Sequence, residues 1–546
     1  MNSTVEYMDE PCLVKAMQGF SVTYKNRLLY SKYAPEKNIL HVIKNSVILS
    51  ETLILCVSPA LGLGLDALSA KLPENTVMLG IEADNSLFEF SKRYCTQLEC
   101  CKKGNFIFLE PNDLQNFPVL INSRSSKWRG VFKRVVRIDF SAGSSFYADF
   151  YDRFYEAMQH SIAQFWKNRI TLVKFGRRYA RNFFQNLHSY SNSGSVEELF
   201  ECIEKPILVL GAGEGLENAI SLPKERLSQF FLIAVDAALP TLKSLGIPVD
   251  AVVCEESQSV ISECFAGLQK SADFAICSLS SCPRAAMNTG NKCLFYTTLF
   301  DDLAFIEKAR KARIIPPIIP PLGSVGVTAV FLALKFRHSE DIPVTTFGLD
   351  FSFSLGKTHA RGTVQHIKRI CSQSKIRPLE NYGANFCEGA FFTADKNNRT
   401  ITTTVALNGY AHIFRNYFYN AKNLFDGANS GLNLGLPIKT LISKTDGSQH
   451  SLQNKIYKTN GTDDIEKKQK IIEYLETEKN ALQDLKSILT GEKKVSELER
   501  NEKIRALLFE RDYLFFHFPD GLRVRFEQDF LNRIRAELDG FLKILK

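Results

Sequence analysis

Long apolar runs are scarce in this 546-residue sequence. No stretch reaches the ~18 apolar residues that a membrane-spanning helix needs, and the most apolar tract, Ile314–Phe336, is interrupted by four prolines and two glycines. The N-terminal residues, MNSTVEYMDEPC, have neither the basic nor the apolar region of a signal peptide. These absences predict a cytoplasmic protein that does not insert into a membrane.

Paired cysteines are also missing. The thirteen cysteines are odd in number and include no CxxC pair. Cys56, Cys254 and Cys277 lie inside apolar runs, where a free thiol behaves as a small hydrophobic side chain. This usage is typical of a reducing compartment and excludes a disulfide framework.

Four familiar catalytic and metal-binding signatures are absent as well. The sequence contains no HExxH, no Asp-x-Asp-x-Asp-Gly, no Gly-x4-Gly-Lys-Ser/Thr and no Gly-x-Ser-x-Gly. Their absence argues against a zinc protease, an EF-hand, a P-loop kinase and a serine hydrolase with a nucleophile elbow. We therefore assign no metal ligands from the sequence, and the need for Mg²⁺ stays open.

The composition is that of a folded protein with an ordinary core. Hydrophobic residues make up 45% of the chain and charged residues 23%, with 68 basic against 59 acidic side chains and a net charge of +9. This length allows about three to five domains. Over so many residues the basic excess is mild; it fits an anionic ligand and does not require nucleic acid.

The order of apolar runs and helical patterns predicts an α/β protein. Its centre is expected to be a doubly wound, Rossmann-like parallel sheet, because apolar strands alternate with helices there. The expected parts are an N-terminal Rossmann-like α/β domain at 1–125, a helical basic linking segment at 126–200, a central catalytic domain at 201–425 and a helical C-terminal domain at 426–546.

The N-terminal domain has the outline of a nucleotide-binding βαβ unit. A strand at Thr52–Ser58 is followed by a turn with Gly62 and Gly64, a helix, and a second strand, Val77–Ile81, that ends at Glu82. The glycine spacing does not match the dinucleotide fingerprint. A tight turn that binds nothing is the preferred interpretation, and a nucleotide site is the alternative.

The linking segment is strongly basic. Residues 166–190 contain six Lys and Arg side chains, no acidic residue, and interleaved aromatic side chains. Such a pattern fits nucleic-acid binding or an amphipathic helix with packed aromatics and solvated charges. We prefer the second interpretation and expect no nucleic-acid partner.

Polar residues and glycines gather where the strands of the central domain end. Ligands bind beyond the carboxyl ends of the strands in such sheets, so these positions are the candidate donor or nucleotide site. The candidates are Gly211, Ala212, Gly213, Gly215, Asp236, Glu255, Glu256, Gly323, Ser324 and Thr358.

Two loops offer chemistry. Gly211 and Gly213 lack a Cβ, so their backbone could approach a phosphate at a helix N-terminus, although Glu214 places a negative charge beside it. In the second loop, GLDFSFSLGKTHARGT, Asp350 and His359 are the candidate catalytic residues. Histidine titrates near neutral pH and suits a general base; a structural loop histidine is the alternative.

Five blocks in this order resemble the motility accessory factor family of flagellin glycosyltransferases, whose core is shared with 6-hydroxymethylpterin diphosphokinase-like proteins. They are LVLGAGEGLE at 208–217, IAVDAALPTLKSLGIPVDAVVCEE at 233–256, PPLGSVGVTAVFLAL at 320–334, FGLDFSFSLGKTHARGT at 347–363 and the stretch ending at Asn423–Asp426. Outside the core, LLYSKYAP at 28–35 and the basic helix at 168–187 resemble the flanking parts of long bacterial members.

The resemblance implies a sialyltransferase-like fold for the central sheet. It also implies transfer of a nonulosonic acid, such as pseudaminic or legionaminic acid, from a CMP-sugar substrate to Ser or Thr of flagellin. It implies His359 as the base, Asp350 as a residue that orients it or holds the substrate, and Ser324 near the phosphate or the sugar carboxylate. The family loop usually reads Gly-x-Gly-Pro-Ser-Leu, and this chain has Glu214 and Gly215 at its Pro and Ser positions. Two alternatives therefore stay open: ATP-dependent pyrophosphoryl transfer, with Mg²⁺ on Asp236 and Glu255, and a non-catalytic flagellin-binding assembly factor.

Overall fold

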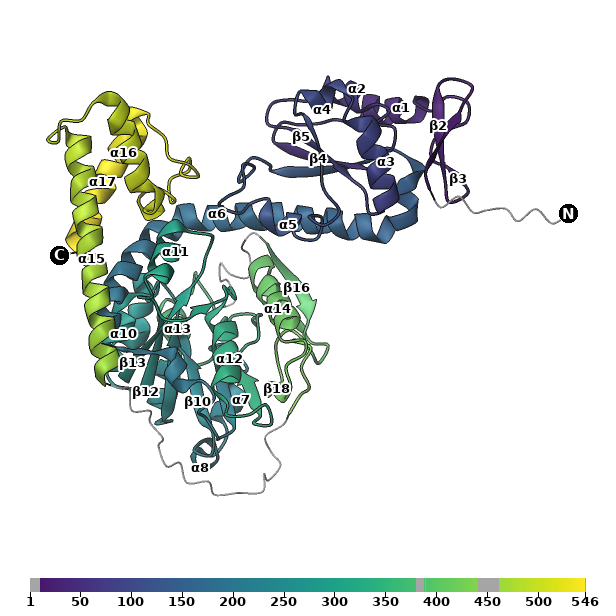
Figure 1. The fold of residues 1–546 in the computed structure, drawn as a ribbon. Coiled ribbons are helices and arrows are strands. Elements are labelled where there is room, and N and C mark those ends of the chain that lie inside the picture. The colour runs from purple at the N-terminus through teal and green to yellow at the C-terminus, as the bar shows by residue number, and fades with distance from the viewer. Residues whose placement is uncertain (1–9, 380–386, 388, 440–460, 546) are drawn as a thin grey trace. The chain divides into compact units, whose positions relative to one another are not determined.

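The computed structural model describes residues 10–379, 387, 389–439 and 461–545 (Figure 1). These residues form two compact units, Met1–Val173 and Lys174–Lys546. The boundary falls within helix α6 (Ala148–Tyr190), so each unit is described by itself. Among the described residues, no helix is both long and apolar enough to cross a bilayer.

Unit 1 is built on a four-stranded parallel sheet with the order β6-β5-β4-β7. Its central strand, β4, is buried at all six positions and alternates between two cores: Leu53, Leu55 and Val57 face one cluster, and Ile54 and Cys56 face the other. The expected Rossmann-like α/β domain is thus present, and its sheet extends past residue 125 to β7. The strands are β4 (Thr52–Val57), β5 (Val77–Ile81), β6 (Phe106–Phe108) and β7 (Arg134–Asp139).

Short helices and a small antiparallel sheet complete unit 1. The helices are α1 (Lys37–Asn45), α2 (Leu65–Ser69), α3 (Asn85–Cys95), α4 (Glu99–Lys102) and α5 (Phe117–Leu120), with the 3-10 turn η1 (Ala142–Tyr147) before α6. The antiparallel sheet contains β1 (Cys12–Lys15), β2 (Phe20–Tyr24) and β3 (Arg27–Leu28).

Unit 2 contains the large parallel sheet that the sequence predicts. Its strand order is β14-β13-β12-β11-β10-β9-β15-β18, with β8 beside β13. The strands are β8 (Gly194–Ser195), β9 (Ile207–Leu210), β10 (Phe231–Val235), β11 (Val249–Cys254), β12 (Ala272–Ser278), β13 (Gly290–Thr298), β14 (Ile318–Ile319), β15 (Val344–Phe347) and β18 (Leu424–Asp426).

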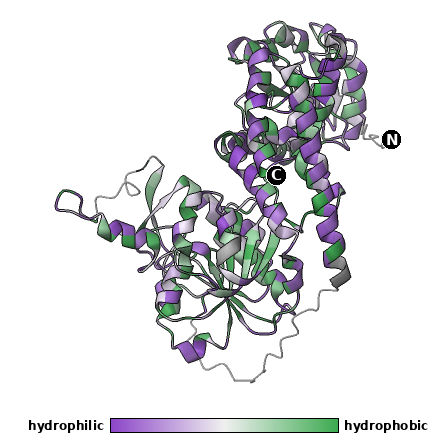
Figure 2. Cartoon of the chain, turned by 90° about the vertical axis from the view of Figure 1, so that its left-hand side faces the viewer, coloured by the Kyte–Doolittle hydropathy of each residue, from purple (hydrophilic) through white to green (hydrophobic). Residues whose placement is uncertain are grey.

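The chain reverses direction across this sheet between β9 and β15. From β9 successive strands are added on one side as far as β14, and β15 and β18 are then added on the other side of β9. This confirms the expected doubly wound topology, which opens a crevice at the carboxyl ends of β9 and β15. The central strands are buried on both faces, and Figure 2 shows them as green arrows among mixed helices.

Helices and one hairpin surround the sheet. The helices are α7 (Leu216–Ile220), α8 (Lys224–Leu227), α9 (Leu239–Ser244), α10 (Pro283–Asn288), α11 (Ala304–Lys311), α12 (Val325–Phe336), α13 (Val364–Cys371) and α14 (Val405–Tyr417). Short 3-10 turns are η2 (Val196–Leu199), η3 (Asp236–Ala238) and η4 (Ser259–Phe265). The hairpin of β16 (Ala390–Ala394) and β17 (Thr400–Thr404) is antiparallel.

The C-terminal part is helical, as expected, with α15 (Gly461–Thr490), α16 (Glu497–Phe509), η6 (Asp512–Leu514) and α17 (Gln528–Ile544). It is joined to the sheet domain by buried polar contacts. The carboxylate of Asp512 accepts the backbone N–H groups of Ala304 and Phe305 at 2.7 and 3.1 Å, and so caps the start of α11. Buried Glu478 forms an ion pair with Lys308 at 2.6 Å.

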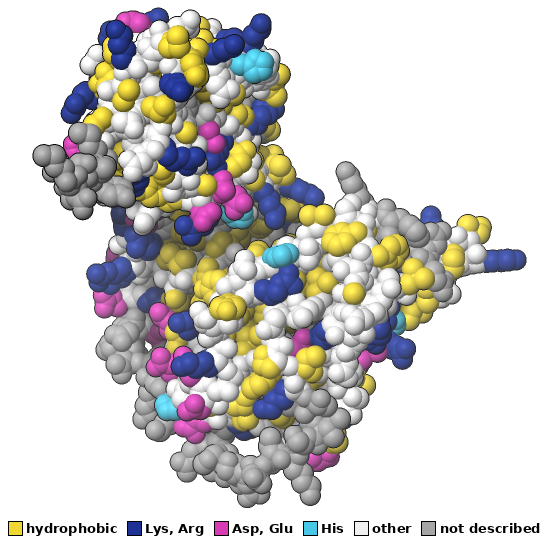
Figure 3. All heavy atoms as spheres, turned by 90° about the vertical axis from the view of Figure 1, so that its right-hand side faces the viewer, with side chains coloured by type: hydrophobic (Ala, Val, Ile, Leu, Met, Phe, Trp, Pro, Cys, Tyr) yellow, Lys and Arg dark blue, Asp and Glu magenta, His cyan; other side chains and the backbone are white. Residues whose placement is uncertain are grey.

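Charge is distributed rather than segregated on the visible surface. On the face drawn in Figure 3, Lys and Arg side chains are spread among apolar and acidic ones. This distribution agrees with the mild basic excess read from the sequence.

Candidate functional site

The glycine loop after β9 lies against the segment that follows β15. Three N–H groups of the loop donate to that segment: Gly211 to the Phe347 carbonyl at 2.7 Å, Gly213 to the Gly348 carbonyl at 2.9 Å, and Gly215 to Asp350 Oδ2 at 2.9 Å. These three donors are therefore engaged within the fold, and a phosphate bound here would need N–H donors from elsewhere.

This contact explains why the loop is rich in glycine. A Cβ on Gly211 would lie 2.3 Å from the Gly348 carbonyl oxygen, and one on Gly213 would lie 2.2 Å from Asp350 Oδ2. Gly348 itself has φ +70°, and its Cβ would lie 2.4 Å from the Gly211 carbonyl oxygen. The glycines thus permit two chain segments to meet at the switch point, a different reason from close approach to a ligand.

A cavity of about 430 Å³ opens at this junction. It brings together eight of the sequence-predicted residues: Gly211, Ala212, Gly213, Asp236, Ser324, Asp350, Thr358 and His359. Their elements are the ends of β9, β10 and β15, the N-terminus of α12 and the loop before α13. The position is the one at which doubly wound sheets hold ligands.

Four predicted residues are not part of the cavity lining. Glu255 accepts hydrogen bonds from Thr298 Oγ1 at 3.2 Å and Thr328 Oγ1 at 2.8 Å, so it ties β13 to α12. Glu256 accepts the Gln258 N–H at 2.8 Å. The other two are backbone positions: Gly215, whose Cβ would meet Ala428, and Gly323, which has φ +80°.

Sequence reasoning missed part of the lining. Phe351, Ser352 and Phe353 lie in the block at 347–363, from which the sequence indicates only Asp350, Thr358 and His359 as candidate site residues. Thr404 and Leu407 come from the junction of β17 and α14, where the Thr404 hydroxyl accepts the Leu407 N–H and caps the helix. The cap signal was readable in the sequence; the place of this helix beside the cavity was not.

His359 is half-buried at the cavity wall. Its Nδ1 lies 3.1 Å from Thr358 Oγ1, and burial lowers its pKa below the ordinary histidine value. The imidazole is therefore neutral at pH 7, the state in which a histidine can accept a proton.

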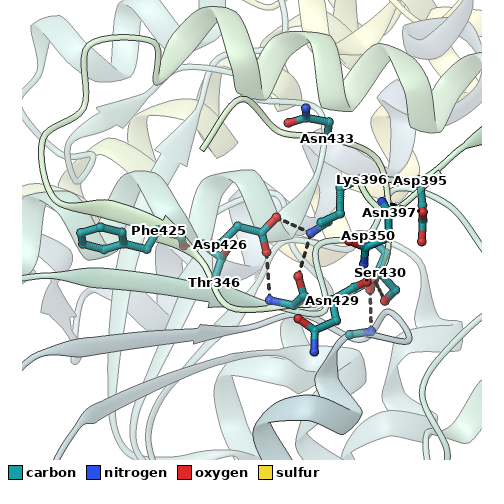
Figure 4. Close-up of polar contacts among 12 residues, drawn as sticks. Thr346, Asp350, Asp395, Lys396, Asn397, Phe425, Asp426, Asn429, Ser430 and Asn433 are labelled. Carbon is teal, nitrogen blue, oxygen red and sulfur yellow. Dashed lines mark hydrogen bonds and ion pairs between the residues drawn. The ribbon is translucent and has the colours of Figure 1, made fainter. Parts of the chain in front are cut away.

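Asp350 is buried, and both of its carboxylate oxygens accept hydrogen bonds from groups other than the histidine. Its Oδ2 accepts the Gly215 N–H, and its Oδ1 accepts the Ser430 hydroxyl at 2.7 Å (Figure 4). No hydrogen bond joins Asp350 to His359 within the part of the chain that is described. Burial raises the pKa of this carboxyl group. Its geometry is that of a residue that holds the glycine loop against the loop after β18.

The turn of the β16–β17 hairpin extends this network. Lys396 forms an almost fully buried ion pair with Asp426 at the end of β18 and donates to the Ala428 carbonyl at 3.0 Å (Figure 4). Arg399 donates to the Asn429 carbonyl at 2.6 Å. The hairpin therefore fixes the loop that presents the Ser430 hydroxyl to Asp350.

The negative charge of Glu214 is compensated locally. Lys357 Nζ lies 3.2 Å from Glu214 and 2.7 Å from Glu217, and the Ser354 hydroxyl donates to Glu214 at 2.5 Å. These contacts hold the loop that carries His359 against the glycine loop. They also engage Lys357, the lysine nearest to His359 in this loop, with two carboxylates.

Asp236 has the least satisfied carboxyl group in the cavity. Its Oδ1 accepts the Ala237 N–H at 2.8 Å, while Oδ2 is buried without a hydrogen-bond partner among the described residues. Burial, with smaller contributions from Glu256 and Glu255, raises its pKa to about 7. At neutral pH this group is therefore poised between its protonated and ionised forms.

Replacing Asp236 with asparagine should stabilise the protein at alkaline pH. Between about pH 4 and 7 the unfolded chain loses the Asp236 proton before the folded chain does, so the native protein loses stability as pH rises through this window. Asp236→Asn removes that penalty, which is on the order of 2–4 kcal/mol. We expect its Tm to exceed that of the parent at pH 8, by a margin that shrinks toward pH 4. Asp341→Asn, on the exposed surface, is the control; a parent protein more stable than Asp236→Asn at pH 8 would contradict the assignment.

The corresponding crevice in unit 1 is occupied by its own side chains. Glu82, the acid of the expected βαβ unit, is fully buried and accepts from Ser91 at 2.7 Å and Tyr151 at 3.3 Å. In the turn after β4, the Leu61 N–H donates to the Tyr30 hydroxyl at 3.2 Å. These contacts favour the tight-turn interpretation over a nucleotide site in this unit.

Comparison with known proteins supports the architecture derived above. A family described as 6-hydroxymethylpterin diphosphokinase MptE-like matches residues 181–356, the segment that carries the glycine loop and Asp350. An uncharacterized protein of Treponema pallidum (strain Nichols) is 32% identical over 98% of this chain and 95% of its own length. The chain therefore belongs to the same family as that relative, and its residues 181–356 form an MptE-like segment.

A solved structure extends the likeness to the whole chain. The MAf glycosyltransferase from Magnetospirillum magneticum AMB-1 aligns with a TM-score of 0.54, covering 98% of this chain and 91% of that one, at 13% sequence identity. At this identity the match establishes the fold. The expected resemblance is thus confirmed in two respects: residues 181–356 match the MptE-like family, and the whole chain shares the fold of the MAf glycosyltransferase.

Proposed function

We propose that the protein is a glycosyltransferase that moves a nonulosonic acid from a CMP-activated donor to Ser or Thr hydroxyls of flagellin. One observation carries the proposal: a neutral histidine, a helix N-terminus and a half-ionised carboxyl group line one cavity at the switch point of the sheet. The fold shared with the MAf glycosyltransferase supports the reaction class.

The N-terminus of α12 is the best place for the anionic part of the donor. Ser324, Val325 and Gly326 line the cavity, and the Ser324 side chain makes no capping hydrogen bond. The first N–H groups of a helix and its dipole favour a phosphate or a carboxylate. This assignment replaces the glycine-loop N–H groups, three of which donate within the fold.

His359 would accept the proton of the acceptor hydroxyl as the sugar bond forms. The sugar passes through an oxocarbenium-like state, which a nearby carboxylate would stabilise. Asp236 lines the cavity and has one oxygen without a partner among the described residues, so it suits that role better than Asp350, both of whose oxygens accept hydrogen bonds.

The family description favours a second candidate, pyrophosphoryl transfer from ATP to a hydroxymethylpterin. That reaction needs Mg²⁺, and the expected pair of ligands does not fit: both oxygens of Glu255 are used by Thr298 and Thr328, outside the cavity lining. A third candidate, a flagellin-binding assembly factor without activity, is favoured by Glu214 and Gly215 in the altered loop.

A binding titration separates these candidates. We expect the full-length protein to bind CMP and a CMP-nonulosonate at least about tenfold more tightly than ATP or GTP, with or without Mg²⁺. Preference for ATP with Mg²⁺ would instead support pyrophosphoryl transfer. Absence of binding to every nucleotide would support the assembly factor.

A matched pair of variants places the nucleotide in the cavity. Ser324→Asp and Ser324→Asn are both good helix caps, so both should fold, but only the aspartate puts a negative charge beside the proposed phosphate. We expect CMP binding at least about tenfold weaker for Ser324→Asp than for Ser324→Asn. Equal affinities would show that the phosphate is bound elsewhere.

A further inference from the structure

A second, larger hollow lies between α6 and α17 in unit 2. It has a volume of about 620 Å³ and shares no residue with the cavity described above. We call it the α6–α17 hollow; it is lined by Lys174, Arg177, Arg178, Arg181, Asn182, Gln185, Gly540, Lys543 and Ile544. Every titratable side chain in this lining is a cation.

The positive charge of the hollow is only partly balanced. The carboxylate of Glu537 lies beside the hollow. Arg177 Nε donates to one of its oxygens at 2.8 Å, and His517 Nε2 lies 3.5 Å from the other. Asp539 on the same helix is paired with Lys486 at 2.8 Å. Asp539 also interacts electrostatically with Lys543, so the five cations face at most two counter-charges, an arrangement that still attracts an anion.

Arg181 is the innermost of these cations. Its Nε is buried without a hydrogen-bond partner in the described residues, and its guanidinium occupies the space where a side chain at position 540 would start, 2.4 Å from an ideal Cβ. Burial and the neighbouring Arg177 lower its pKa. Arg181 is partly buried, and a guanidinium with an unpaired buried Nε among the described residues is a group that a phosphate or carboxylate would stabilise.

The geometry also favours a compact ligand over an extended one. Lys174, Arg177, Arg178 and Arg181 follow the spacing of a single helix face, and Lys543 lies across the hollow from them. These cations converge on one space instead of forming a long stripe. A small ligand with several negative charges can contact these cations together. In an extended nucleic-acid backbone, most of the phosphates would lie outside the hollow.

We propose that the α6–α17 hollow binds a compact polyanion that carries two or more phosphate groups. The proposal is independent of the transferase reaction. Its floor is nevertheless connected to the sheet, because Asn182 Nδ2 donates at 3.0 Å to the carbonyls of Ser257 and Ser280, which lie in the loops that follow β11 and β12.

Inorganic triphosphate is the probe for this site. The full chain should bind it with one-to-one stoichiometry in calorimetry, and Arg178→Ser combined with Lys543→Ser should weaken binding at least about tenfold. The matched control, Arg284→Ser with Lys468→Ser, removes the same charge from exposed positions outside both cavities and should change affinity less than twofold. Ser324→Asp should also leave triphosphate affinity unchanged, because it alters only the other cavity.

Three results would overturn the proposal. Absence of triphosphate binding would remove the site, and equal losses in the two double variants would show non-specific attraction. The third is a single-stranded oligonucleotide that displaces triphosphate and binds more than tenfold more tightly; it would identify the hollow as part of a nucleic-acid surface. Displacement by ATP at similar affinity would support the phosphate chemistry and identify a nucleotide as one of its sources.

Discussion

Replacing His359 with glutamine should slow sugar transfer by about 10²–10⁴-fold while CMP affinity stays within about twofold. The side chain lies on the cavity wall, and among the described residues its polar neighbour is the Thr358 hydroxyl at 3.1 Å. Removing it takes away a proton acceptor without breaking a network that holds the fold. Transfer rate and CMP binding, measured on the same preparation, test this expectation.

The pH dependence of transfer provides an independent signature. Because burial lowers the pKa of His359, the imidazole stays neutral below the usual histidine range. Activity should therefore fall in two steps as the pH drops: first near pH 7, where the Asp236 carboxylate becomes protonated, and again through the lowered pKa of His359, where the imidazole becomes protonated. In His359→Gln the residual activity should keep the step near pH 7 and lose the second one.

His412 provides a matched control. It lies exposed on α14, so His412→Gln should keep both the rate and the pH profile of the parent protein. If His359→Gln transferred sugar at the parental rate, the histidine would be a structural loop residue, the alternative that the sequence left open.

Replacing Asp350 with alanine should destabilise unit 2 by about 2–5 kcal/mol and abolish CMP binding. The change leaves the Gly215 N–H and the Ser430 hydroxyl buried without their acceptor, and it releases the glycine loop from the loop after β18. A drop in Tm of several degrees, measured together with CMP affinity, is the expected observation.

Replacing Asp350 with asparagine distinguishes a structural role of this residue from a catalytic one. The amide keeps the shape of the carboxyl group; its oxygen can accept the Gly215 N–H, and its nitrogen can donate to the Ser430 oxygen. We expect Asp350→Asn to transfer sugar within about tenfold of the parent, and Ser430→Ala to lose roughly 1 kcal/mol of stability. Loss of transfer in Asp350→Asn with normal Tm and CMP affinity would instead make Asp350 a catalytic residue.

Much of the fold could be predicted from the sequence because its signals are local. The apolar run from Ile207 to Leu210 and the one at Thr52–Ser58 have the length and composition of strands buried on both faces, and alternation with helices then requires parallel sheets. The same reasoning places residues such as Asp236 and Asp350 at strand ends. Eight of the predicted positions consequently line one cavity.

The functional meaning of those positions depended on partners far away in the chain. The sequence cannot show that Gly213 packs on Asp350. Nor can it show that Glu255 accepts hydrogen bonds from Thr298 and Thr328, or that Lys357 forms an ion pair with Glu214. Each of these contacts joins residues that the sheet topology brings together across 43 or more positions. A residue type and a strand end are set locally, so the sequence determined the α/β architecture and the edge that carries the site. The tertiary structure decided which carboxyl groups accept hydrogen bonds within the fold and which keep an oxygen without a partner among the described residues. The reason is that hydrogen bonding and burial depend on neighbours that only folding supplies.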